Sequence, residues 1–485
     1  MRFATLIGPE LKDLLRENPA ALSEVLEELH PEDIAEIVDD LSEEEAATLL
    51  AHVPAEIAAP VFERMSRERQ EEIITRMSPE VAADIVESMS SDDRADLVQD
   101  LDDEPREKIM AALEPEEARD IRALSEFAEN TAGGLMTTDF IGLSKDLTIR
   151  ETIEAVRARA DSVETVYYIY VLHGVDDELP ASTPEHANES ARAAHALHHD
   201  GPYKLLGVAS LRDLLLAEST QTLGDVMTEN VITLAPDLHQ EEVAKTLAKY
   251  DLSAVPVTDK FGRLLGVVTF DDVMDVLVAE QTEDVQKLAG IEPVEGGYFA
   301  TGFWRFISAR ARWLIALFIG EFFTGTALAR YEGSFHAVAT LVMFIPLVIS
   351  SGGNSGSQSA TIVIRAMAVG DIKDKDTVRV VRRELGQGMI LGLILGSIGF
   401  VRTMLWRPVV AHQFRLSCVV SLTLVAVVTL GCAVGALFPM LLKRMRFDPA
   451  VSSTPFIASL VDVLGIITYF SIAKFFLASV MTPAH

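Results

Sequence analysis

An aspartate stands inside the last long apolar segment of the chain. Asp462 lies about one third of the way through residues 451–480, in the run TPFIASLVDVLGIITYF. A carboxylate within a membrane is costly unless it faces a water-filled path or a cation. That run contains no basic residue, so a metal ion is a natural partner for Asp462. The alternative is a structural polar contact between helices.

A run of small polar residues, GGNSGSQS, occupies positions 352–359 of another apolar segment. Small residues let helices pack closely, or let backbone carbonyls face a pore. Asn354 and Gln358 stand four residues apart, on one helical face. Neutral oxygen ligands beside a single carboxylate suit Mg²⁺, a hard cation that keeps much of its water. Pro346 is expected to loosen the helix that precedes the run.

A second acidic residue lies in the apolar segment 312–331. Glu321 occurs in LFIGEFFTGTA. Two interpretations are open, namely a further ion or proton group and a packed residue that is hydrogen-bonded to a neighbouring helix.

The segment TFDDVMDVLVAEQTEDVQKLAG carries a series of acids at helical spacing. At 100° per residue, Asp272, Asp275 and Glu283 fall within about a quarter turn, and Glu280 and Asp284 flank them. This face either binds cations or is a solvated surface of the helix.

The elements that must position these residues begin with a repeat of 12 residues. Its apolar positions are Leu29, Leu41, Val53, Met65, Met77, Met89, Leu101 and Leu113. Serine or aspartate often follows, and an acid stands three residues after each apolar position, in the first helical turn. Units this short must stack on one another, so residues 1–130 are predicted to form an all-α superhelical domain.

Residues 136–282 contain two copies of one α/β unit, 136–217 and 226–282. Each copy begins with Met-Thr and ends with a Leu-Gly-Val motif, and this order of motifs resembles a tandem pair of CBS domains. Such pairs often bind adenine nucleotides near the Ser/Thr and Asp of the last motif, Ser210 and Asp213 or Thr269 and Asp272. The alternative is that these aspartates cap helices. An insertion, about 174–202, carries His195, His198 and His199, which indicate a flexible loop or a transition-metal site.

Five apolar segments follow, at about 312–331, 336–364, 386–405, 416–442 and 451–480. Each approaches or exceeds the ~20 residues that span a bilayer. Twelve Arg and Lys residues lie in the connections on one side and four on the other. The excess places the N-terminus in the cytoplasm and the C-terminus outside.

Charge and cysteine content exclude several classes of protein. Residues 1–300 carry 65 acidic and 24 basic side chains, which argues against a nucleic-acid partner. Cys418 and Cys432 lie in an apolar run and show no zinc spacing. We find no nucleophile–base spacing and no phosphate-binding glycine loop, so an enzyme is not expected. No cleaved signal peptide is evident, which keeps the first half in the cytosol.

The runs PLVISSGGNSGSQSATIVIRAMA and FDPAVSSTPFIASLVDVLGIITYFSIAK, after an acidic helical domain and a CBS pair, resemble the MgtE family of magnesium channels and transporters. The similarity covers nearly the whole chain. It implies a homodimer in the cell membrane, with the ion path at the subunit interface. It also implies that residues 270–300 contain a plug helix, which closes the pore from the cytosol.

The resemblance assigns roles residue by residue. The pore carboxylate falls on Asp462, and Asn354 and Ala458 fall on neighbouring pore positions. Thr454 stands where some relatives have Asn. Regulatory Mg²⁺ ligands fall on the plug-helix acids and on Asp92, Asp96 and Asp251. One expected ligand falls on Pro60, so that contact is either missing or moved to Glu63.

These inferences predict a multidomain protein. Residues 1–130 form the Mg²⁺ sensor, 131–282 the CBS pair, 270–300 the plug helix and 301–485 a five-helix transmembrane domain. The expected function is Mg²⁺ influx that stops when cytosolic Mg²⁺ bridges the acidic domains. The alternatives are transport of Co²⁺ or Mn²⁺, and a CBS-type nucleotide or ion sensor without transport.

Overall fold

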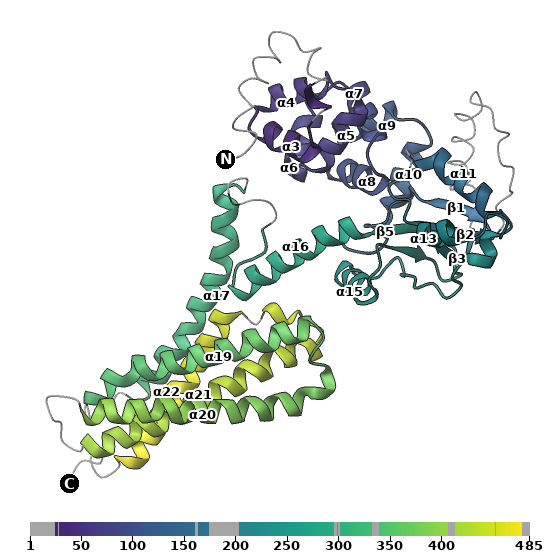
Figure 1. The fold of residues 1–485 in the computed structure, drawn as a ribbon. Helices are drawn as coiled ribbons and strands as arrows, with labels where there is room; N and C mark the ends of the chain where they lie inside the picture. The colour runs from purple at the N-terminus through teal and green to yellow at the C-terminus, as the bar shows by residue number, and fades with distance from the viewer. Residues whose placement is uncertain are drawn as a thin grey trace. The chain divides into compact units, whose positions relative to one another are not determined.

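The computed structural model describes residues 25–27, 29–160, 163–173, 203–294, 298, 301–331, 339–405, 413–451 and 453–477. The chain divides into two compact units, residues 1–278 and 279–485 (Figure 1). The insertion at 174–202, with His195, His198 and His199, lies outside the described residues.

The first unit begins with a stack of short helices. They are α3 (Pro31–Asp39), α4 (Glu43–Leu50), α5 (Ala55–Glu63), α6 (Arg67–Ile74), α7 (Pro79–Glu87), α8 (Ser91–Asp100), α9 (Asp103–Ala112) and α10 (Glu117–Leu124). From α3 to α9 each helix begins 12 residues after the previous one, which confirms the predicted repeat. Each helix packs chiefly on the helix two places along, so the short units share one apolar core.

The apolar positions of the repeat are buried as predicted, but not every Ser or Asp that follows them caps a helix. Six of the eight apolar positions are buried, and Leu29 and Met77 pack against the same core. Ser42 forms a capping box with Glu45 at the start of α4. Ser66, Ser90 and Asp102 make no side-chain capping bond. At the start of α6, α8 and α9, the acids of the first turn therefore complement the positive end of the helix dipole in place of a side-chain cap.

The α/β part of the first unit contains two related motifs. The first is β1 (Ile141–Ser144), α11 (Ile149–Arg159), β2 (Tyr168–His173), β3 (Lys204–Ser210) and α13 (Leu211–Leu216). The second is α14 (Leu223–Val226), α15 (Gln240–Tyr250), β4 (Ala254–Thr258), β5 (Leu264–Thr269) and the start of α16 (Phe270–Leu288). In the first, β2 pairs parallel with β1 and antiparallel with β3, and in the second, β4 and β5 pair antiparallel.

The Leu-Gly-Val motif of each copy has a structural reason. Gly207 and Gly266 lie against the Met-Thr segment of the opposite copy, and a Cβ on either would meet a threonine carbonyl oxygen at 2.9 or 2.8 Å. Thr137 and Val267 exchange backbone hydrogen bonds, as do Val208 and Thr228. The two copies are therefore joined through their motifs, which explains why both motifs recur together.

The second unit consists mainly of long helices. They are the end of α16, α17 (Phe303–Ala329), α19 (Ile345–Ala368), α20 (Thr377–Met404), α21 (Gln413–Arg444) and α22 (Thr454–Phe476), with short 3₁₀ turns η3 (Ala339–Phe344), η4 (Asp374–Asp376) and η5 (Pro449–Val451). Figure 1 shows α19 to α22 side by side, in agreement with their mutual contacts.

Three of these helices, α20, α21 and α22, are long and apolar enough to cross a membrane. The five predicted spans are therefore supported in part. In α17 the arginines of the first turns and Glu321 lower the mean hydropathy, and in α19 the Gly and Ser residues lower it.

Glycines bring the backbones of α19 and α21 into contact. A Cβ on Gly435 would lie 2.2 Å from the carbonyl oxygen of Gly356, and one on Gly431 would lie 2.6 Å from that of Gly352. The small residues of 352–359 thus serve close helix packing, as one of the two interpretations predicted. The expected loosening by Pro346 is not found, because this proline occupies the first turn of α19, where it is tolerated.

Candidate functional site

In the second unit, Asp462 lies where α22 packs against α19. The side chain is half-buried. A Cβ on Gly353 would meet the Asp462 Oδ1 atom and the Ala458 Cβ atom, each at 3.5 Å. The glycine therefore gives the carboxylate room beside α19, and two of the predicted positions, Asp462 and Ala458, adjoin it.

Polar groups of α19 line the same region. Asn354 and Gln358 are both exposed on the described chain, which agrees with the shared face predicted for them. The Ser357 hydroxyl donates to the Thr454 carbonyl oxygen at 3.2 Å. Position 454 thus contributes its backbone carbonyl to the contact between α19 and α22.

Glu321, on α17, faces α22. Its Oε1 atom accepts a hydrogen bond from the Ser459 hydroxyl at 3.1 Å, and its charge acts on Asp462. The two interpretations left open for Glu321 are therefore not exclusive, because the side chain contacts a neighbouring helix and also influences the second carboxylate.

A buried acid that the sequence analysis missed joins three helices of the second unit. Glu384, on α20, is 7% exposed, and its Oε2 atom lies 2.6 Å from the Ser359 hydroxyl of α19. The same hydroxyl lies 2.9 Å from the Cys432 carbonyl oxygen of α21. Glu384 precedes the apolar run predicted as the third span, so it was overlooked. The observed α20 begins earlier, at Thr377.

In the first unit, carboxylates from distant segments meet at the start of α16. Ligand atoms of Glu164, Asp271 and Asp272 lie within 4.8 Å of one another. The Thr269 hydroxyl lies 3.1 Å from the Glu164 Oε1 atom and also contacts Asp272. Glu164 stands more than 100 residues from its partners in sequence, so spacing alone offers no signal for it.

Asp92, in the first turn of α8, approaches this cluster from the helical repeat. It is 8% exposed, and its Oδ1 atom has no hydrogen-bond partner in the part of the chain that the structure describes. Burial, together with the charges of Asp272, Asp93 and Glu164, raises the pKa of Asp92. An unpaired buried carboxylate among other carboxylates is costly, and a divalent cation would relieve the cost.

Hydrogen bonds hold α8 against the first α/β motif. The Ser91 hydroxyl lies 3.0 Å from the Thr137 hydroxyl, and the Ser91 amide donates to Asp139 at 3.1 Å. The Ser90 amide donates to Glu63 Oε1 at 2.9 Å. These contacts fix the start of α8, and therefore Asp92, beside α16.

The other predicted regulatory residues have different surroundings. Asp275 acts electrostatically on Asp93 and Asp272, so it lies near the cluster. Asp96 forms an ion pair with Arg67 at 2.6 Å, but that arginine also pairs with Asp100 and Glu129. Burial outweighs the ion pair and raises the pKa of Asp96 to about 7. Asp251 lies exposed at the end of α15, in a left-handed conformation with φ 52°.

Further along α16, Glu283 forms an ion pair with Lys287 at 2.5 Å. Glu280 and Asp284 lie on the same helix. Pro60 lies inside α5, and Glu63, one turn later, acts electrostatically on the cluster through Asp93 and Asp272. Glu63 therefore lies near the cluster, and its role as a ligand stays a prediction.

The raised pKa values predict a pH dependence for the first unit. Burial raises the pKa of Glu63 to about 7 and that of Asp272 to about 6. The folded state then binds more protons than the unfolded state between about pH 4 and pH 7, so stability without metal falls as pH rises through this window.

We expect the first unfolding transition of the purified protein in EDTA to move to lower temperature between pH 5 and pH 8. A divalent cation competes with those protons, so it should raise this transition more at pH 8 than at pH 6. Scanning calorimetry at several pH values measures both effects. A transition that is independent of pH in EDTA would contradict the proposed burial of these acids.

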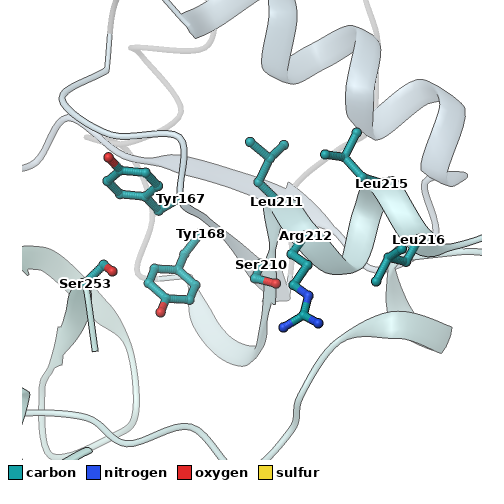
Figure 2. A pocket seen from close by; sticks show the side chains of 8 residues that line it. All are labelled: Tyr167, Tyr168, Ser210, Leu211, Arg212, Leu215, Leu216 and Ser253. Atoms are coloured by element: carbon teal, nitrogen blue, oxygen red, sulfur yellow. The ribbon is translucent and has the colours of Figure 1, made fainter. Parts of the chain in front are cut away.

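Two adjoining cavities border the first α/β motif. One, of about 210 Å³, is lined by Tyr170, Asp213 and Asn230 among others. The other is more open, of about 550 Å³, and Figure 2 shows Tyr168, Ser210 and Arg212 along it. Ser210 and Asp213 form a capping box, with the hydroxyl donating to Asp213 at 2.5 Å.

Comparison with known proteins gives the arrangement a context. Residues 345–472 match the MgtE family, described as divalent cation transporters. Residues 29–130 match the MgtE intracellular N domain, and residues 223–279 match the CBS domain.

The magnesium transporter MgtE of Thermus thermophilus is 37% identical over 74% of this chain and 73% of its own length. That of Enterococcus faecalis is 33% identical over 74% of this chain and 72% of its own length. Among solved structures, the soluble part of a magnesium transporter is 30% identical, with a TM-score of 0.49, over 57% of this chain and 99% of the other.

The helical repeat, the CBS motif and the apolar helices with an internal carboxylate define a membrane-embedded transport protein with soluble domains. Its similarity to the two transporters is strong and covers most of both chains. The chain belongs to the MgtE family of divalent cation transporters.

Proposed function

We propose that this protein carries Mg²⁺ into the cell past Asp462 and that Mg²⁺ bound to its acidic cytosolic domains closes the path. The observation that carries the proposal is the half-buried Asp462 carboxylate beside Gly353, in an apolar helix of a family of divalent cation transporters. The names of the relatives, magnesium transporters, support Mg²⁺ as the ion. An inside-negative potential of 100 mV would drive a divalent ion inward by about 4.6 kcal/mol.

The proposal includes the finer organisation of the chain. Residues 1–130 act as sensor, 131–282 as CBS pair, 270–300 as plug helix and 301–485 as the transmembrane part. All five long helices from α17 to α22 cross the membrane, with the N-terminus in the cytoplasm and the C-terminus outside. The distribution of Arg and Lys in the connections supports this orientation.

We propose that two copies of the chain enclose the path. Asn354 and Gln358 are exposed on one chain, on a helix whose surroundings are largely apolar. Lipid offers these groups no hydrogen bonds, whereas a second copy and a water-filled path between the two copies would satisfy them.

Closure would follow from Mg²⁺ at the acidic cluster. Asp92 of the repeat, Glu164 of the first CBS motif and Asp272 of α16 come from three parts of the chain. An ion that binds them together stabilises the compact arrangement over a separated one, and this difference in affinity is what shifts the equilibrium. Without the ion, their like charges favour separation.

An adenine nucleotide such as ATP is proposed at the first CBS motif. The sequence analysis names two places for this ligand, Ser210 and Asp213 or Thr269 and Asp272. The second pair lies among Glu164 and Asp271, whose charges would repel phosphates. The cavities beside Ser210 and Asp213 offer Arg212 for phosphate and tyrosine rings for a base.

Reconstitution in liposomes tests the function. With a Mg²⁺ dye inside and an inside-negative potential, external Mg²⁺ should enter rapidly and stop entering when internal Mg²⁺ reaches millimolar concentrations. Faster entry of Co²⁺ or Mn²⁺ would favour the first alternative. If no divalent ion enters while the protein still binds nucleotide, a sensor without transport replaces the proposal.

A further inference from the structure

The end of α16 is tied to the connection that precedes α22. Lys287 Nζ lies 2.5 Å from Glu283 Oε1 and 2.7 Å from Asp448 Oδ2. The lysine side chain is only 24% exposed. Glu283 and Asp448 are 37% and 40% exposed, so the lysine is the more buried member of the link and is held by two carboxylates at once.

Asp448 connects this lysine to the start of α22. Its second oxygen, Oδ1, accepts a hydrogen bond from the Ala450 amide at 2.8 Å. That bond closes the turn that leads into η5, which directly precedes α22. One carboxylate therefore joins the last turn of α16 to the turn that sets where α22 begins.

A second contact fixes the same helix end. The Trp313 indole of α17 donates to the Ser453 hydroxyl at 2.9 Å, and that hydroxyl also accepts from the Phe456 amide as the N-cap of α22. Gly290, just after α16, has φ +72°, and a Cβ there would lie 2.4 Å from the Trp313 ring. The turn after α16 therefore packs against the indole that donates to Ser453, the N-cap residue of α22.

The junction also has room to change. A cavity of about 310 Å³ lies beside it, lined by Lys287, Gly290, Trp313 and Val451 among others. Leu288, by contrast, packs on the apolar core of the second unit. The polar links can therefore rearrange beside the cavity while the apolar contact keeps the end of α16 in place.

Burial opposes the charge of Lys287, but its hydrogen bonds to Asp448 and Glu283 outweigh that effect and raise the pKa of the ammonium group. The group stays charged throughout the physiological pH range, so the link does not depend on pH there.

We propose that Lys287 is a positioning residue, which through Asp448 sets the first turn of α22 and so transmits movement of α16 to Asp462. Asp462 lies eight residues into α22, about 12 Å along the axis, so a rigid helix carries a displacement of its first turn to the carboxylate. The inference rests on the proposed regulated Mg²⁺ path. It adds the physical link between the regulatory helix and the helix that bears the pore carboxylate.

A charge swap tests the link in full-length protein in liposomes. Lys287→Glu and Asp448→Lys are each expected to shift the internal Mg²⁺ concentration for half-inhibition by about fivefold or more, the range of a typical coupling between sites. The double variant K287E/D448K restores an ion pair and should return the midpoint to within about twofold of wild type. Lys375→Glu, the same charge change at an exposed lysine of the second unit, should leave the midpoint unchanged.

If a reversed charge prevents folding, the neutral variants Lys287→Met and Asp448→Asn, alone and combined, allow the same comparison of single and double variants. The single variants should shift the midpoint, and the double variant should shift it no further than either single one. Midpoints that stay at the wild-type value in both sets would overturn the inference, as would single effects that simply add in the double variants. A wild-type protein without inhibition by internal Mg²⁺ would instead refute the proposed function, so the two failures can be told apart.

Discussion

Replacing Asp462 by asparagine is expected to reduce Mg²⁺ entry into liposomes by about 10- to 100-fold. The substitution keeps the size of the side chain but removes its charge. A hydrogen bond to a charged group contributes about 1.5–3 kcal/mol, and every 1.4 kcal/mol is a factor of about ten. Because Gly353 leaves the carboxylate room beside α19, the hydrated ion should contact it directly.

The matched control is Ser471→Ala, on the same helix. The Ser471 hydroxyl donates to the Ile467 carbonyl oxygen of its own helix at 2.6 Å, so its loss should leave entry within about twofold of wild type. Thermal unfolding in detergent checks that both variants fold. If Asp462→Asn folds and conducts as well as wild type, the carboxylate does not lie on the ion path.

The helical repeat was predictable because its signal is local and repeated. Every unit places an apolar residue, a turn residue and an acid at the same spacing. A unit whose own pattern is ambiguous can therefore be assigned from the units beside it. The CBS motif was recognisable for a similar reason. Gly207 and Gly266 leave room where the two copies join, so a Leu-Gly-Val motif appears in each copy.

The contacts of the membrane part were less accessible to prediction. A carboxylate inside an apolar run is visible in sequence, and this identified Asp462 and Glu321. Their proximity is not visible, because it depends on how α17 packs on α22. Glu384 was missed since it lies before the predicted span, although the longer α20 buries it against Ser359.

In the acidic cluster the sequence identified residue types but not all partners. Asp92 and Asp272 were named from the family resemblance, and the structure brings them together with Glu164, which has no motif of its own. Asp96 has a partner that the sequence did not indicate. Arg67 pairs with it at 2.6 Å, and no spacing rule reveals a pairing between α6 and α8, so the role of Asp96 as a ligand stays a prediction.

Replacing Glu164 by glutamine is expected to raise the internal Mg²⁺ concentration for half-inhibition by about tenfold or more. Glu164 and Asp272 approach each other closely, and burial and the charge of Asp272 raise the pKa of Glu164. Removing one carboxylate lowers the attraction for a divalent ion, so closure needs more Mg²⁺. It also relieves part of the repulsion that separates the domains, which acts in the opposite direction. Losing one charged ligand at about 1.5–3 kcal/mol corresponds to about 10- to 100-fold, partly offset by that relief.

Glu151→Gln is the matched control, because Glu151 lies on α11 of the same motif and caps it with Thr148, a role that an amide oxygen can retain. Its midpoint should equal that of wild type. Entry at low internal Mg²⁺ should be the same in all three proteins, since the path itself is untouched. Protection of the first unit, residues 1–278, from protease by Mg²⁺ gives an independent readout, which Glu164→Gln should shift in the same direction. An unchanged midpoint together with unchanged protection would mean that the cation closes the protein without Glu164, and the cluster at the start of α16 would then have to bind it through Asp92 and Asp272 alone.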